Sequence, residues 1–117
     1  MLSGEALLII EGEERPLRQW DFVHCPPGTK HVIVGAGDSP FTVFAVGALE
    51  RHTTGARVDG TLQGTHDWGA YTVDEAALRH GAGVEEETTD AEVAYARFRE
   101  PRPTRYRDGW LHGAASR

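Results

Sequence analysis

The residue best placed to do chemistry is His31, which follows the turn Pro26-Pro27-Gly28 and begins an apolar stretch. Two successive prolines donate no backbone hydrogen bonds, and Gly28 tolerates the positive φ that a tight reversal requires. Such a turn would hold the imidazole rigidly at the start of a strand, where a ring nitrogen could be directed at a metal ion. We therefore predict His31 as a candidate metal ligand, although one histidine supplies only one ligand.

No other titratable residue forms a pattern with His31. Cys25 is the single cysteine, and its apolar surroundings predict a small buried side chain rather than a thiolate nucleophile. His24 precedes it, and successive residues of a strand face opposite sides, so these two residues should not share an ion. The remaining histidines are predicted to lie on the surface or to cap a helix: His52, His66, His80 and His112.

The elements around His31 are predicted to be short strands separated by turns. Apolar-rich stretches bounded by glycine or proline cover residues 5–11, 14–18, 20–25, 31–34 and 41–46. Several short strands at this spacing are typical of a β-sandwich or a β-barrel.

The segment around the turn resembles the second conserved motif of the cupin superfamily, G-x-x-x-x-x-P-x-G-x-x-H-x-x-x-N. Pro26, Gly28 and His31 match that motif. Trp20 stands where its first glycine is expected, and Gly35 stands where its asparagine is expected. The resemblance implies an all-β, double-stranded β-helix (jelly-roll) barrel, in which His31 is either a metal ligand or a barrel-lining histidine bonded to a neighbour.

The first cupin motif, H-x-H-x-x-x-x-E-x-x-x-x-x-x-G, is represented only by its closing glycine, Gly4. The resemblance implies two histidines and a glutamate further upstream, but the sequence begins at Met1. Since a transition metal generally needs three or more protein ligands, we expect a divalent metal to bind through His31 only in a complete form that adds the upstream ligands. Either a truncated start has left the barrel incomplete at its N-terminal edge, or the chain is a reduced cupin without the metal.

The chain is predicted to form one domain with three parts: a barrel core over 1–50, a glycine-rich connection over 51–71, and a helical extension with a tail over 72–117 that packs on the barrel. Two short helices are predicted in the extension. Thr72-Val73-Asp74-Glu75 has the form of a capping box, and Thr89-Asp90-Ala91-Glu92 signals a second helix start.

Composition restricts the partners and the compartment. The formal net charge of −6 on 117 residues argues against nucleic acid and against an anionic membrane surface, because both need concentrated positive charge. No apolar run approaches the roughly 20 residues of a membrane span. With one cysteine no internal disulfide can form, which predicts a cytoplasmic protein.

Three functions follow as alternatives. The first is a cupin-domain protein that binds a small molecule of unassigned identity in its barrel. The second is a metal-dependent enzyme of the dioxygenase, isomerase or decarboxylase type, although no acid, base or nucleophile beside His31 can be named. The third is a metal-free structural or dimerisation module, in which a homodimer covers an exposed sheet edge.

Overall fold

The computed structural model describes residues 1–47, 57–62 and 69–105. The chain divides into two compact units, one of residues 1–45 together with the chain from 102 onward, and one of residues 46–101. The predicted surface histidines His52, His66 and His112 lie outside the described residues, as does the tail from residue 106. The predicted parts 1–50, 51–71 and 72–117 of one domain stay a prediction.

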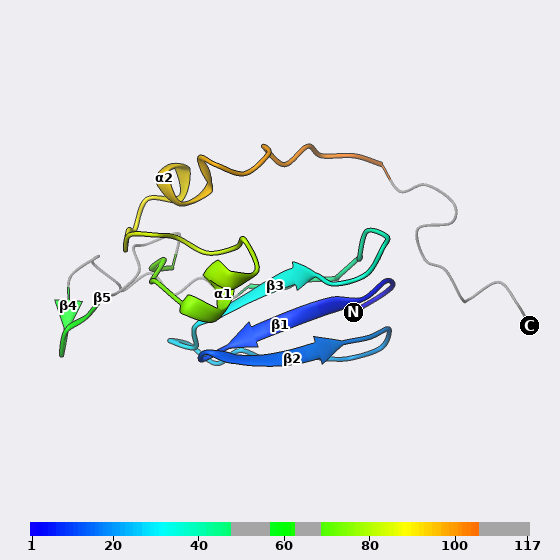
Figure 1. Ribbon diagram of the computed structural model, residues 1–117, viewed down its shortest axis with the longest axis horizontal. Coiled ribbons are helices and arrows are strands. Elements are labelled where there is room, and N and C mark those ends of the chain that lie inside the picture. Colours follow the sequence, from blue (N-terminus) through cyan, green and yellow to red (C-terminus); the bar gives the residue numbers. More distant parts are fainter. Residues whose placement is uncertain (48–56, 63–68, 106–117) are drawn as a thin grey trace, which may run out of the picture. The chain divides into compact units, whose positions relative to one another are not determined.

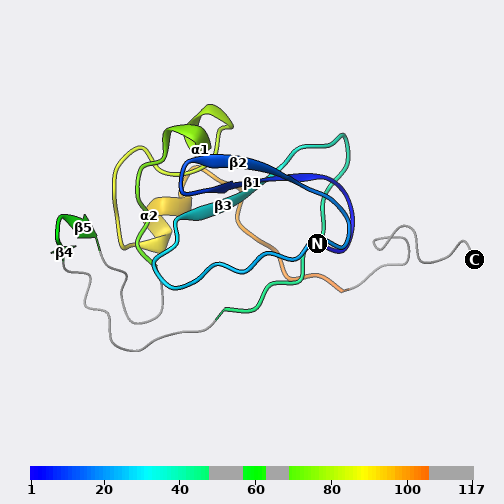
Figure 2. The ribbon, with the colours of Figure 1, turned by 90° about the horizontal axis from the view of Figure 1, so that it is seen from below.

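The first unit contains a three-stranded antiparallel sheet. Its strands are β1 (Ala6–Ile10), β2 (Glu13–Leu17) and β3 (His31–Gly35). Figures 1 and 2 show β1 between the other two strands, in the order β2-β1-β3. The predicted strands 5–11, 14–18 and 31–34 are thereby confirmed.

A tight hairpin joins β1 to β2. Ile10 pairs with Glu13, which leaves Glu11 and Gly12 as the two turn residues, with φ angles of 50° and 78°. Two successive positive φ angles define a type I′ turn, whose twist matches that of the flanking strands. This turn fixes the register of the hairpin, and therefore decides which side chains reach the core.

The larger apolar cluster of this unit lies on one face of the sheet. Ala6, Leu8 and Leu17 are buried there, and partly buried apolar side chains pack against them: Met1, Ile10, Val23, Ile33 and Phe41. Leu7 and Ile9 alternate with these residues and lie on the opposite face of β1. Ile9 is also buried, so both faces of this strand are covered.

Beyond β1, residues 1–3 lie between two further segments. The backbone N–H of Trp20 donates to the carbonyl of Met1 over 2.9 Å. On the other side, Leu2 N–H donates to Thr42 O over 2.8 Å and Thr42 N–H donates to Ser3 O over 2.9 Å. The segments that follow β2 and β3 therefore flank residues 1–3, just as β2 and β3 flank β1.

The predicted cupin-like jelly-roll barrel is wrong for this structure. Residues 20–25 and 41–46 were predicted as strands, but over the described residues they form no ladder, apart from one isolated bridge between Thr42 and Ser3. The described strands form two small open sheets and no closed barrel. An apolar, extended segment has the sequence pattern of a strand, but it becomes one only when a second backbone satisfies its N–H and C=O groups.

The second unit combines a small hairpin with two short helices. Strands β4 (Arg57–Val58) and β5 (Thr61–Leu62) pair through an Asp59-Gly60 turn with two positive φ angles. The helices are α1 (Glu75–Arg79) and α2 (Ala91–Tyr95), so the two helices predicted by the capping signals are confirmed. Asp74 rather than Thr72 caps α1, and its carboxylate accepts from Ala77 N over 3.0 Å.

Candidate association surface

His31 lies in an exposed position at the start of β3. The turn before it forms as predicted: Thr29 N–H donates to Pro26 O over 3.1 Å, and Gly28 has a φ of 80°. The imidazole Nδ1 lies 2.9 Å from the carbonyl oxygen of Thr29. The stiff turn and this contact hold the ring close to its own backbone.

No metal centre forms around His31 in the part of the chain that the structure describes. Within residues 1–47, 57–62 and 69–105, no three histidine, cysteine, aspartate or glutamate side chains gather around a common point. The description of this chain as a metal-binding barrel is corrected accordingly. The role of His31 itself as one metal ligand stays a prediction.

Cys25 and His24 follow the alternation expected of an extended segment. Val23 and Cys25 are half-buried, whereas Phe22 and His24 are exposed. The two side chains therefore face opposite ways, as a period of two requires. Cys25 is less buried than a core residue, which the sequence did not indicate.

The outer edge of β3 presents backbone groups that have no partner among residues 1–47, 57–62 and 69–105. Glu11 N–H donates to Lys30 O over 2.9 Å and Ala36 N–H donates to Glu5 O over 3.1 Å, so the even-numbered residues of this strand bond to β1. The backbone groups of His31, Ile33 and Gly35 consequently point away from β1. No described residue forms a backbone hydrogen bond with the outward-facing N–H and C=O groups of these three residues.

The opposite edge of the sheet is different. The outer edge of β2 carries Pro16, which has no N–H to donate, and exposed charged residues accompany it. Arg15 forms an ion pair with Glu13 over 2.7 Å. Proline and charge on an edge strand are the usual protection against pairing with another chain, so the two edges of this sheet are not equivalent.

Large apolar side chains are exposed on the two segments that flank residues 1–3. Phe22 is 89% exposed, Trp20 is 72% exposed and Phe44 is 79% exposed. Exposed aromatic side chains are candidates for contact with a partner. The sequence pattern did detect these segments, but it assigned them to an internal ladder.

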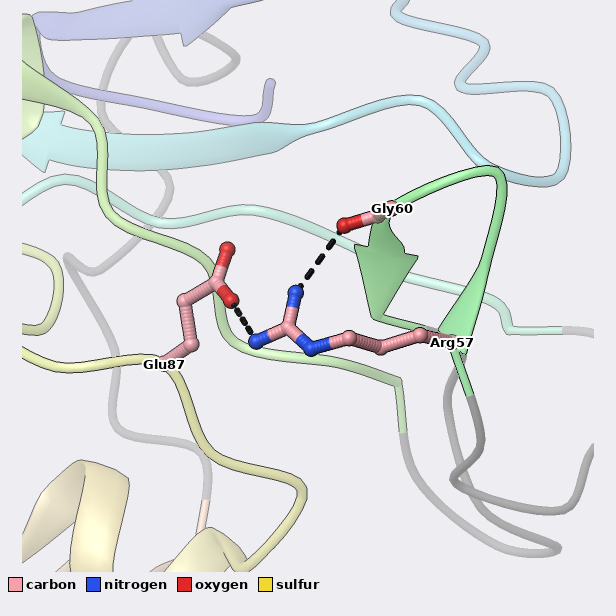
Figure 3. A network of polar contacts seen from close by, with 3 residues as sticks. All are labelled: Arg57, Gly60 and Glu87. Carbon is pink, nitrogen blue, oxygen red and sulfur yellow. Dashed lines mark hydrogen bonds and ion pairs between the residues drawn. The ribbon is translucent and has the colours of Figure 1, made fainter.

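The polar contacts of the second unit are structural. Figure 3 shows the guanidinium of Arg57 reaching both the carboxylate of Glu87 and the carbonyl of Gly60, the latter over 2.9 Å. Tyr71 and Tyr95 stack edge to face with ring centroids 5.6 Å apart. Burial raises the pKa of Tyr71 above its usual value, and the neighbouring hydroxyl of Tyr95 raises it further through charge repulsion and a hydrogen bond.

Comparisons with known proteins give one partial similarity. Nothing matches the chain among protein families or among solved structures. The large ribosomal subunit protein uL18 of Candida albicans is 44% identical over 57 residues, which cover 49% of this chain and 19% of that protein. The chain thus spans about a fifth of the relative that it matches.

The comparisons and the fold together overturn the identification as a cupin. No finding relates the chain to cupins, and the described strands do not close into their barrel. The matched residues Pro26, Gly28 and His31 form a tight turn into a strand, which many antiparallel sheets use.

In the described part of the chain, no helix is long and apolar enough to cross a membrane.

Proposed function

We propose that this chain is a protein-association module that forms a homodimer through the outer edge of β3. The observation that carries the proposal is the row of backbone groups at His31, Ile33 and Gly35, which have no partner among the described residues. A strand edge of this kind binds a second strand by main-chain hydrogen bonds.

The sequence of β3 suits pairing with a second copy of itself. In an antiparallel pair centred on Ile33, that residue would lie opposite its own copy, and His31 would lie opposite Gly35. Val32 and Val34 would also be opposite one another, giving β-branched pairs that stabilise a sheet. Every outward-facing N–H and C=O group of the strand would then be bonded, and the two sheets would become one under twofold symmetry.

The outer edge of β2 does not support the same arrangement. An antiparallel pair centred on Arg15 would place two arginines opposite each other, and like charges in directly opposed positions destabilise a sheet. Pro16 would face the partner without an N–H to donate. We therefore assign the dimer interface to the outer edge of β3.

A charge exchange on β3 tests the proposal. The double substitution Val32→Lys with Val34→Lys places like charges opposite each other across the dimer, whereas Val32→Lys with Val34→Glu places opposite charges there. Both variants add charge to the same two half-buried positions, so their effects within one chain are closely matched. We expect the first variant to be a monomer and the second to remain a dimer in sedimentation velocity. Equal masses for the two variants would contradict pairing through β3.

A second candidate function is contact with RNA. It is favoured by the partial similarity to a large ribosomal subunit protein, and it stands against the expectation from net charge that the chain has no nucleic-acid partner. Fluorescence anisotropy of a labelled single-stranded RNA, titrated with the whole chain at low salt, tests it. Saturable binding is the expected result, and an unchanged anisotropy would reject this function.

Binding of a small molecule and catalysis by a metal-dependent enzyme stay predictions from the sequence. Neither has a set of described side chains that favours it over association.

A further inference from the structure

The segment that follows α2 carries a regular series of arginines. Arg99, Arg102 and Arg105 are all exposed, and they are spaced three residues apart. Figure 1 draws this part of the chain in orange as it leaves α2 without helix or strand pairing. Because the three arginines belong to one short stretch, the local backbone alone sets their spacing.

Two prolines restrict the middle of that backbone, residues 100–103, to extended conformations. Pro101 and Pro103 fix their own φ angles near −65°, and each also restricts the residue before it, which is Glu100 or Arg102, to extended conformations. Polyproline II geometry has three residues per turn and a rise of about 3.1 Å per residue. It would place Arg99, Arg102 and Arg105 along one edge, about 9 Å apart.

These three arginines differ from the arginine that precedes them. Arg97 is engaged within the chain: it donates to Gly83 O over 2.5 Å, lies 3.8 Å from Glu85, and its guanidinium carbon lies 4.9 Å from the ring centroid of Phe98. The side chains of Arg99, Arg102 and Arg105 have no hydrogen bond or ion pair within the described part of the chain. They are therefore available to a ligand.

We propose that Arg99, Arg102 and Arg105, here called the arginine stripe, bind the backbone phosphates of single-stranded RNA; this rests on the second candidate function and assigns its residues. Guanidinium groups bind phosphate oxygens in a bidentate manner. An extended row of them suits an extended polymer, whose phosphates repeat along its length. The net charge of −6 on the whole chain would confine contact to this one basic segment.

The experiment compares two triple variants of the whole chain by fluorescence anisotropy with a labelled oligouridylate. The first carries Arg99→Gln, Arg102→Gln and Arg105→Gln. The second removes the same charge elsewhere, through Arg15→Gln, Arg18→Gln and Lys30→Gln. We expect the first variant to lose about tenfold or more in affinity and the second to stay within about twofold of the unsubstituted chain. The dependence of the logarithm of affinity on the logarithm of salt concentration should also flatten by about 2, since each phosphate contact on a single strand contributes about 0.7.

Four results would overturn the proposal, and they differ in what they leave standing. An equal loss in both variants would mean that only net charge matters. Undiminished RNA binding by the first variant would remove the arginine stripe but keep the RNA function. Failure of the unsubstituted chain to bind RNA would remove both. Equal affinity for a poly-glutamate peptide would replace RNA by an acidic protein as the partner.

Discussion

Gly4 lies directly against Phe41: a Cβ atom at Gly4 would come within 2.7 Å of the Cα of Phe41 and 2.8 Å of the carbonyl oxygen of Pro40. Gly4 also has a φ of 81°, in the left-handed region that side chains disfavour. This close approach lets the backbone before β1 pair with Thr42, so it joins the start of the chain to the segment after β3.

Substitution of Gly4 by alanine should therefore be much more costly than the same change at another left-handed glycine. We expect Gly4→Ala to lower the free energy of unfolding by more than about 2 kcal/mol, because conformational strain and overlap with backbone atoms add. Gly12→Ala is the matched control. It has a similar φ of 78° but no neighbour within 4 Å, so it should cost about 1 kcal/mol. Urea denaturation measures both, and equal losses would show that the contact with Phe41 does not matter.

The N-cap of α2 provides a second test of the structure. The carboxylate of Asp90 accepts from the backbone N–H groups of Glu92 and Val93, and the first contact is 2.8 Å. Asp90→Ala should cost about 1 kcal/mol in the free energy of unfolding, whereas Asp90→Asn should cost only a few tenths. Circular dichroism during urea denaturation distinguishes the two variants. If alanine and asparagine were equivalent, the cap would have no energetic role.

The ion pair between Arg57 and Glu87 should contribute little. The two side chains are 54% and 34% exposed, so solvent screens their interaction. A double-mutant cycle with Arg57→Ala and Glu87→Ala should give a coupling energy of about 0.5 kcal/mol. High salt should reduce this energy. A coupling that stays constant in high salt would point to packing rather than charge.

The paired tyrosines predict a pH dependence at the alkaline end. The pKa of Tyr71 is raised in the folded state above its ordinary value of 10.0, so the folded chain holds this proton more tightly than the unfolded chain. The stabilisation is complete below pH 10 and falls as the pH rises through the folded pKa. Ultraviolet absorbance titration should show one tyrosine that ionises late, and Tyr71→Phe should remove that step. Tyr95→Phe should shift the step to lower pH, because the hydrogen bond and the second charge are lost.

Local features of the fold could be predicted from the sequence because they depend on few neighbouring residues. The Pro26-Pro27-Gly28 turn, the three strands of the larger sheet and the two helices all form near their predicted positions. The N-cap of α1 is Asp74, two residues after the predicted Thr72. The Asp74 carboxylate reaches Ala77 N, and a side chain at Thr72 would not reach it.

The barrel could not be predicted because it depends on which backbone pairs with which. Residues 20–25 and 41–46 have the apolar pattern of strands, yet they find almost no ladder partner among the described residues. The motif around His31 describes a turn and a strand, and these recur in sheets that never close. The arginine stripe was overlooked for another reason. The net charge of −6 describes the whole chain, so it conceals a short segment that is locally basic.

The most direct test of the central proposal is sedimentation velocity of the unsubstituted chain over a range of micromolar concentrations. The account predicts a species of twice the mass of one chain, which the double substitution Val32→Lys with Val34→Lys converts to a monomer. A monomer at every concentration, or a dimer that survives this double substitution, would contradict association through β3.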